Sequence, residues 1–92
     1  MDNLRKYIKA KKNYMQEKQF SKKMQAKQEL QEALKDIQVK ENMQGWAYKN
    51  YEVLGAYDIL ENDKKIATEL QYLLKNGDIR AVWIDNEYQK IA

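Results

Sequence analysis

Hydrophobic residues recur at helical spacing along the first 44 positions of the chain. This stretch, Asp2 to Gln44, contains neither glycine nor proline, and Asp2 or Asn3 can cap a helix by accepting hydrogen bonds from its first backbone amides. The periodic apolar positions are Leu4, Ile8, Met15, Ala26, Leu30, Ala33 and Ile37. A spacing of eleven residues, which is three helical turns, relates Leu4, Met15, Ala26 and Ile37. The pattern predicts one long helix that ends at Gly45.

Polar residues interrupt this apolar line in its middle, at Lys11, Gln19 and Lys22. The chain could break near Phe20 and Ser21, with Ser21 as a second N-cap, but no glycine or proline helps a sharp turn there. One helix, bent or straight, is therefore favoured over a hairpin. Such a helix would extend about 60 Å, roughly twice the diameter of so small a domain. It must then project, pair with a second copy or lie on a partner, unless Ala26–Ile37 packs on the sheet and the preceding residues form a solvated arm.

After Gly45 the pattern changes to the alternation typical of strands. One face of a first strand would carry Tyr51, Val53, Gly55, Tyr57 and Ile59. Gly55 would mark a bulge or a close backbone contact. In a second strand Ile79, Ala81 and Trp83 alternate with Arg80, Val82 and Ile84. Asp85-Asn86 would then form a turn, and Glu87–Ile91 would return as the partner strand.

The segment Lys64 to Lys75 fits two descriptions. As a helix it would place Ile66, Ala67, Leu70, Leu73 and Leu74 on one face. As a strand it would place Ile66, Thr68, Leu70, Tyr72 and Leu74 on one face, with a turn at Glu61–Lys64 before it. Asn76-Gly77 is a strong signal for a two-residue hairpin turn, because both residues tolerate positive φ. The strand is favoured, although helix propensity and the apolar moment point the other way.

These patterns predict an α+β fold, in which a long N-terminal helix, bent or broken near Phe20-Ser21 if not straight, packs on a small C-terminal antiparallel sheet of three to four strands. The 92 residues suit a single small domain, with residues 1–44 as a basic helix or projecting arm and residues 45–92 as an aromatic-rich sheet.

The composition removes several kinds of chemistry. The chain has no cysteine and no histidine, so thiolate sites, disulfides and the commonest general base and metal ligand are absent. No glycine-rich phosphate loop or nucleophile motif occurs, and most carboxylates of the second half, Asp58 apart, look like turn residues. We expect neither an enzyme, nor a metal, nor a cofactor. Without a signal-peptide pattern or a transmembrane stretch, the sequence predicts a cytoplasmic protein that is not membrane-bound.

Positive charge is concentrated at the N-terminus. Residues 1–27 contain nine basic and two acidic residues, whereas residues 45–92 contain six and eight. On a continuous helix one polar strip without a carboxylate would comprise Arg5, Lys9, Lys12, Gln16, Gln19, Lys23 and Lys27. Such a strip can follow a phosphate backbone and bind it in a salt-sensitive way. The alternative is a solvated face that keeps a small protein soluble.

Tyrosines and tryptophans add a second candidate chemistry. Tyr7 and Tyr14 lie one heptad apart beside the basic strip, where they could stack on bases or pack against Leu4, Ile8 and Met15. The second half carries Trp46, Tyr48, Tyr51, Tyr57, Tyr72, Trp83 and Tyr88. About half of these rings are needed for the core of so small a sheet, and the remainder could bind a peptide or a base.

The sequence therefore predicts a small non-enzymatic binding module whose basic N-terminal helix contacts nucleic acid or another acidic surface. The expected binding residues are Arg5, Lys9, Lys12, Gln16, Lys23, Lys27, Tyr7 and Tyr14. The alternative is a protein-interaction or inhibitor module, of the kind found as a phage- or plasmid-type accessory protein, which acts through the apolar helix stripe or the aromatic sheet. In that case the N-terminal helix could form a homodimer.

Overall fold

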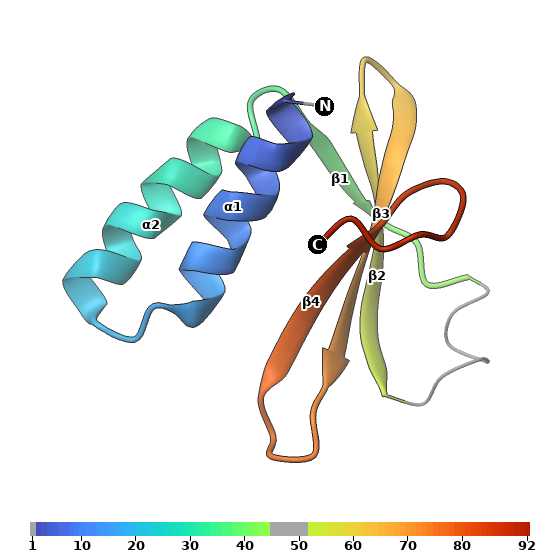
Figure 1. The fold of residues 1–92 in the computed structure, drawn as a ribbon. Coiled ribbons are helices and arrows are strands. Elements are labelled where there is room, and N and C mark those ends of the chain that lie inside the picture. Colours follow the sequence, from blue (N-terminus) through green and yellow to red (C-terminus); the bar gives the residue numbers. More distant parts are fainter. Residues whose placement is uncertain (1, 45–51) are drawn as a thin grey trace. The chain divides into compact units, whose positions relative to one another are not determined.

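The computed structural model of the chain describes residues 2–44 and 52–92 and has two helices followed by a four-stranded sheet (Figure 1). In chain order the elements are α1 (Asp2–Gln16), α2 (Phe20–Ala33), β1 (Gln38–Glu41), β2 (Val53–Glu61), β3 (Lys64–Leu73) and β4 (Ile79–Ile84). The chain divides into two compact units, Met1–Gln38 and Val39–Ala92. The predicted α+β class is confirmed, but the prediction of a single long helix is wrong.

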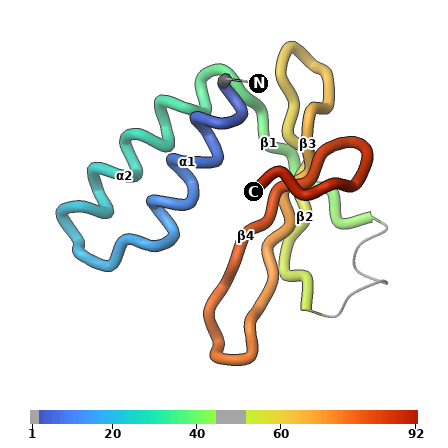
Figure 2. The backbone as a smooth tube through the Cα atoms, viewed as in Figure 1, coloured from blue at the N-terminus to red at the C-terminus, as the bar shows by residue number. Residues whose placement is uncertain are grey.

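The predicted helix is broken between Gln16 and Phe20, and α2 runs back beside α1 as a helical hairpin (Figure 2). No glycine or proline forms this turn. Instead, Oε1 of Glu17 accepts hydrogen bonds from the backbone N–H groups of Lys18 and Gln19, each at 3.1 Å. Gln19, not the expected Ser21, is the N-cap residue, with an extended backbone (φ −75°, ψ 131°) and no side-chain cap bond. At the other end of the hairpin, α1 already includes Asp2 and Asn3, which were expected to cap it.

Burial explains why the chain folds back. Among residues 3–38 the buried apolar side chains are those of Leu4, Tyr7, Ile8, Ala10, Ala26, Leu30, Ala33 and Ile37. On α2 the buried residues are only Ala26, Leu30 and Ala33, a face too small to hold an isolated helix in water. Packing α2 against α1 removes both apolar faces from water, which an unbroken helix could not do with its own residues.

The second helix also ends earlier than the sequence predicted. The N–H of Leu34 donates to the carbonyl of Leu30 at 3.0 Å and closes α2. Gln38–Glu41, assigned to the helix by its pattern, is instead strand β1. The expected helix stop, Gly45, lies outside the described residues. The second compact unit begins within this strand, at Val39.

The sheet has the strand order β1-β2-β3-β4, and the β2–β3 and β3–β4 pairs are antiparallel. The strand description of β3 is therefore confirmed. A two-residue turn joins β2 to β3, since Glu61 pairs with Lys64 and both Asn62 and Asp63 have positive φ (52° and 64°). This backbone matches the twist of a tight hairpin.

The next turn differs from its prediction. Asn76-Gly77 does not form a two-residue turn by itself. The N–H of Leu74 donates to the carbonyl of Asp78 at 2.8 Å, and the N–H of Gly77 donates to the carbonyl of Leu74 at 3.0 Å. The loop thus has three residues, with Lys75 as the first. Gly77 has φ of +89°, the left-handed position that such loops place last. The side chain of Asn76 accepts a further bond from the N–H of Asp78 at 3.0 Å.

The pairing of β2 with β3 shifts register after Val53 and again after Ile59. The first shift confirms the bulge predicted near Gly55. A Cβ atom on Gly55 would lie 2.7 Å from the hydroxyl oxygen of Tyr57, so the close neighbour of this glycine is a side chain and not the backbone that the sequence suggested. Because of the bulge at Leu54, Val53 does not share the face of Gly55, Tyr57 and Ile59 as the alternation suggested.

One face of the sheet carries several fully buried side chains. Register places Tyr57, Glu69 and Trp83 in one row across β2, β3 and β4. On this face Ile59, Ala67, Glu69 and Trp83 are all at most 1% exposed. The apolar face predicted for β3 is the opposite one, where Thr68 is buried but Ile66, Leu70 and Tyr72 are only partly buried. The alternation of β3 did not indicate which of its two faces is the more buried, because the partner strands decide which face is covered.

The C-terminal segment turns back along β4 but does not form a strand there. Oδ1 of Asp85 accepts hydrogen bonds from the N–H groups of Glu87 and Gln89, each at 2.9 Å, and Tyr88 has φ of 63°. After this loop Lys90 forms an isolated antiparallel bridge with Ile84. The predicted return strand Glu87–Ile91 is thus reduced to one bridge, with a further bond from the N–H of Ile91 to the carbonyl of Trp83 at 2.7 Å.

Candidate functional site

The exposed side of α1 is positively charged between Arg5 and Lys12. From Asn3 to Gln16 the chain has five basic residues and no carboxylate. Four of the five are exposed and fall within an arc of about 120° at 100° per residue; they are Arg5, Lys6, Lys9 and Lys12. We call these four residues the basic face. Gln16 is also exposed within the same arc, so four of the predicted binding residues share one side of α1.

The remaining predicted cations lie on the other helix. Lys23 and Lys27 belong to α2, so the strip that an unbroken helix would carry is divided between two antiparallel helices. The ammonium of Lys23 lies 4.7 Å from the centre of the Tyr14 ring, a cation–π contact that joins the two helices near their turn. Lys27 is exposed, and Lys23 is half-buried.

The two predicted tyrosines pack within the protein. The Tyr7 side chain is 2% exposed, so its ring presents no face to a base. Tyr14 is half-buried, with Lys23 over one face of its ring. The packing role that the sequence left open for both residues is the one that their burial supports.

Two exposed aromatic residues, Phe20 and Tyr88, were not among the predicted binding residues. Phe20, the first residue of α2, is 81% exposed, and Met24, one turn further on, is 45% exposed. With Lys27 at the seventh position after Phe20, these three side chains lie on the same side of α2. The sequence held a signal, because Phe20 does not fall on the apolar line of the helix.

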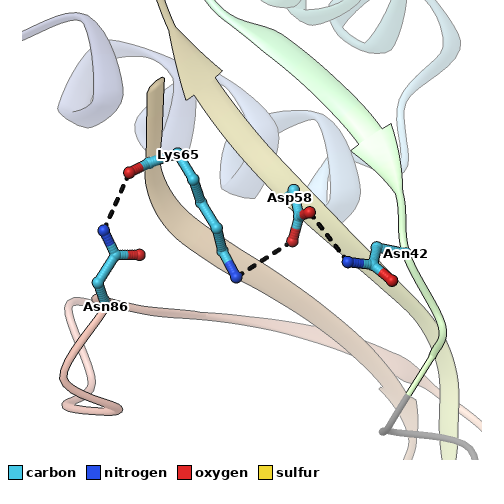
Figure 3. Close-up of polar contacts among 4 residues, drawn as sticks. All are labelled: Asn42, Asp58, Lys65 and Asn86. Atoms are coloured by element: carbon cyan, nitrogen blue, oxygen red, sulfur yellow. Dashed lines mark hydrogen bonds and ion pairs between the residues drawn. The ribbon is translucent and has the colours of Figure 1, made fainter. Parts of the chain in front are cut away.

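The carboxylate that the sequence singled out, Asp58, joins neighbouring segments of the sheet unit (Figure 3). Its Oδ2 accepts a hydrogen bond from Nδ2 of Asn42 at 3.0 Å, and its Oδ1 lies 3.2 Å from Nζ of Lys65. The carbonyl of Lys65 in turn accepts a bond from Nδ2 of Asn86 at 2.9 Å. Both oxygens of Asp58 thus contact protein groups. Among residues 2–44 and 52–92, no three potential metal ligands of the carboxylate, thiol or imidazole type lie together.

A buried polar row lies on the covered face of the sheet and was missed by the sequence analysis. Oε1 of Glu69 accepts a hydrogen bond from the indole N–H of Trp83 at 2.9 Å, and Oε2 accepts one from Nε2 of Gln71 at 2.8 Å. Glu69 is 1% exposed and Trp83 is fully buried. In the described part of the chain every buried polar side-chain atom has a hydrogen-bond partner. These contacts support a structural role for Glu69.

Neither described helix is both long enough and apolar enough to cross a membrane. Comparisons of the chain with protein-family models, curated proteins and solved structures find no match.

Proposed function

We propose that the chain is a non-enzymatic binding module that holds the phosphate backbone of nucleic acid against the basic face of α1. The observation that carries the proposal is the division of α1 into two sides. Leu4, Tyr7 and Ile8 are buried, while Arg5, Lys6, Lys9 and Lys12 are exposed on the opposite side, and no carboxylate occurs from Asn3 to Gln16. The fold thus holds this side outward, and its charge matches that of a phosphate backbone.

The size of the basic face sets the expected strength of the electrostatic term. Arg5 and Lys12 are seven residues apart, which is about 10 Å along the helix. Four cations that each neutralise one duplex phosphate give a slope of about −3.6 for the logarithm of affinity against the logarithm of salt concentration. Affinity should therefore fall about 150-fold between about 50 and about 200 mM salt.

Fluorescence anisotropy of a labelled duplex, titrated with the full chain at several salt concentrations, tests the proposal. The double variant Arg5→Gln/Lys9→Gln should reduce the slope to about −1.8, because two phosphate contacts are lost. The matched control is Lys40→Gln/Lys75→Gln, which removes the same charge from two exposed positions of the second unit and should leave the slope nearly unchanged. Absence of binding at low salt, or an affinity independent of salt, would refute the proposal.

A second candidate is a protein-interaction module that acts through the sheet. Leu4, Ala26 and Ile37 of the apolar helix stripe are at most 3% exposed, so the stripe offers little surface to a second helix. At one end of the sheet, however, Leu73 and Ile79 form a cross-strand pair and are 43% and 52% exposed. If a second copy covers this pair, light scattering should show a dimer at high protein concentration, and Leu73→Lys should abolish it.

A further inference from the structure

Phe20 is the most exposed large hydrophobic side chain among the described residues, at 81%. A ring in this position contributes almost nothing to the hydrophobic core, because burial is what makes an aromatic side chain stabilising. It stands where the turn of the helical hairpin meets α2, so that neighbouring helical turns do not cover it. The fold therefore presents a free aromatic ring at this turn.

The chain on both sides of Phe20 is rich in lysine. Residues 18–28 contain four lysines and no carboxylate; the lysines are Lys18, Lys22, Lys23 and Lys27. Lys23 and Lys27 follow Phe20 by three and seven positions and share its side of α2. The preceding acid, Glu17, directs one carboxylate oxygen to the backbone N–H groups of the turn. An anionic ligand that approaches the ring thus meets cations on the same side.

This combination fits one ligand class better than others. An apolar protein contact would place its hot spot in a patch depleted of lysine, whereas here Phe20 and Met24 share their side of α2 with Lys23 and Lys27. An aromatic ring flanked by cations is the arrangement by which proteins stack a base and neutralise its phosphates. In a duplex the base faces are already stacked on one another, so only a single strand offers a face to the ring.

We propose that Phe20 stacks on a base of single-stranded nucleic acid, while lysines of α2 contact the adjacent phosphates. The inference rests on the proposed function and adds to it the form of nucleic acid that the hairpin turn selects. Stacking of one base on an aromatic ring corresponds to an affinity change of about 5-fold to about 140-fold on truncation of that ring.

The test compares two labelled probes of about 16 nucleotides, an oligothymidylate and a duplex of the same length, by fluorescence anisotropy with the full chain at low salt. Phe20→Ala should weaken binding of the oligothymidylate by about 5-fold to about 140-fold and leave the affinity for the duplex nearly unchanged. Because Phe20 is exposed, the variant should unfold at the same denaturant concentration as the natural chain.

Three further variants separate stacking from simple apolar contact. Phe20→Leu keeps an apolar side chain without a π face and should lose affinity as Phe20→Ala does. Phe20→Trp keeps a stacking ring and should retain affinity. Met24→Ala removes exposed apolar surface from the same side of α2 and should leave affinity for the oligothymidylate nearly unchanged.

The outcomes distinguish failure of this inference from failure of the proposed function. Salt-sensitive binding of both probes with no effect of Phe20→Ala would refute stacking and leave the proposed function standing. If Phe20→Leu bound the oligothymidylate with the affinity of the natural chain, stacking would be refuted in favour of an apolar contact. Phe20-dependent binding to vesicles of anionic phospholipid, with no binding to either probe, would refute both in favour of a membrane surface.

Discussion

The hydrogen bond between Trp83 and Glu69 offers the sharpest test of how the sheet is held together. Its donor and acceptor are 2.9 Å apart, and both side chains are at most 1% exposed. Water therefore cannot replace the bond when it is removed, and a buried group that loses its partner costs about 1–3 kcal/mol. We expect this range for the coupling free energy between the two side chains.

A double-mutant cycle isolates that coupling. Trp83→Phe removes the indole N–H but also leaves space in the core, and Glu69→Met removes the acceptor but also the partner of Gln71. These additional costs occur in the single variants and in the double variant, so they cancel in the cycle. The difference that remains measures the Trp83–Glu69 interaction. We expect the two single effects to sum to about 1–3 kcal/mol more than the effect of the double variant.

Urea denaturation followed by far-ultraviolet circular dichroism gives the four free energies of unfolding, since the substitution of Trp83 would change a fluorescence signal directly. A control cycle pairs Trp83→Phe with Glu61→Met. Glu61 pairs with Lys64, which is five residues from Glu69 along β3, or about 16 Å, so these effects should add within about 0.5 kcal/mol. A Trp83–Glu69 coupling as small as that of the control cycle would refute the assignment of a stabilising bond.

Two glycines give further predictions. Gly55→Ala should destabilise the chain by about 1–3 kcal/mol, because its Cβ would lie 2.7–3.0 Å from the side chain of Tyr57. In a Tyr57→Leu background the same substitution should cost much less free energy of unfolding, as measured by urea denaturation. An equal cost in both backgrounds would contradict the steric cause. Gly77→Ala should cost about 1 kcal/mol, because a residue with φ of +89° must place a side chain in the left-handed region. Nothing lies within 4 Å of a Cβ there, so Gly77→Asn, which tolerates positive φ, should cost less than Gly77→Ala, and equal losses in urea denaturation would refute the backbone explanation.

The local patterns of the sequence were sufficient for three of the four strands and for the charge of α1. Alternation and turn residues predicted β2, β3 and β4, because a strand has a period of two wherever it lies and asparagine, aspartate and glycine favour turns through their own backbone preferences. The concentration of lysine and arginine between Arg5 and Lys12 is likewise a property of the linear sequence. The exposure of these side chains followed from the apolar spacing on the opposite side of the same helix.

Contacts between distant residues determined the remaining features. The chain breaks at Glu17–Gln19 because Ala26, Leu30 and Ala33 are buried only when α2 lies against α1, and no local propensity reports that gain. Tertiary pairing also buried Glu69, since its row includes Trp83 of β4 and Tyr57 of β2. Phe20 became an exposed ring beside a turn for the same reason. The binding residues predicted to share one helix face were thereby divided between two helices, because the whole chain decides which segments pack against one another.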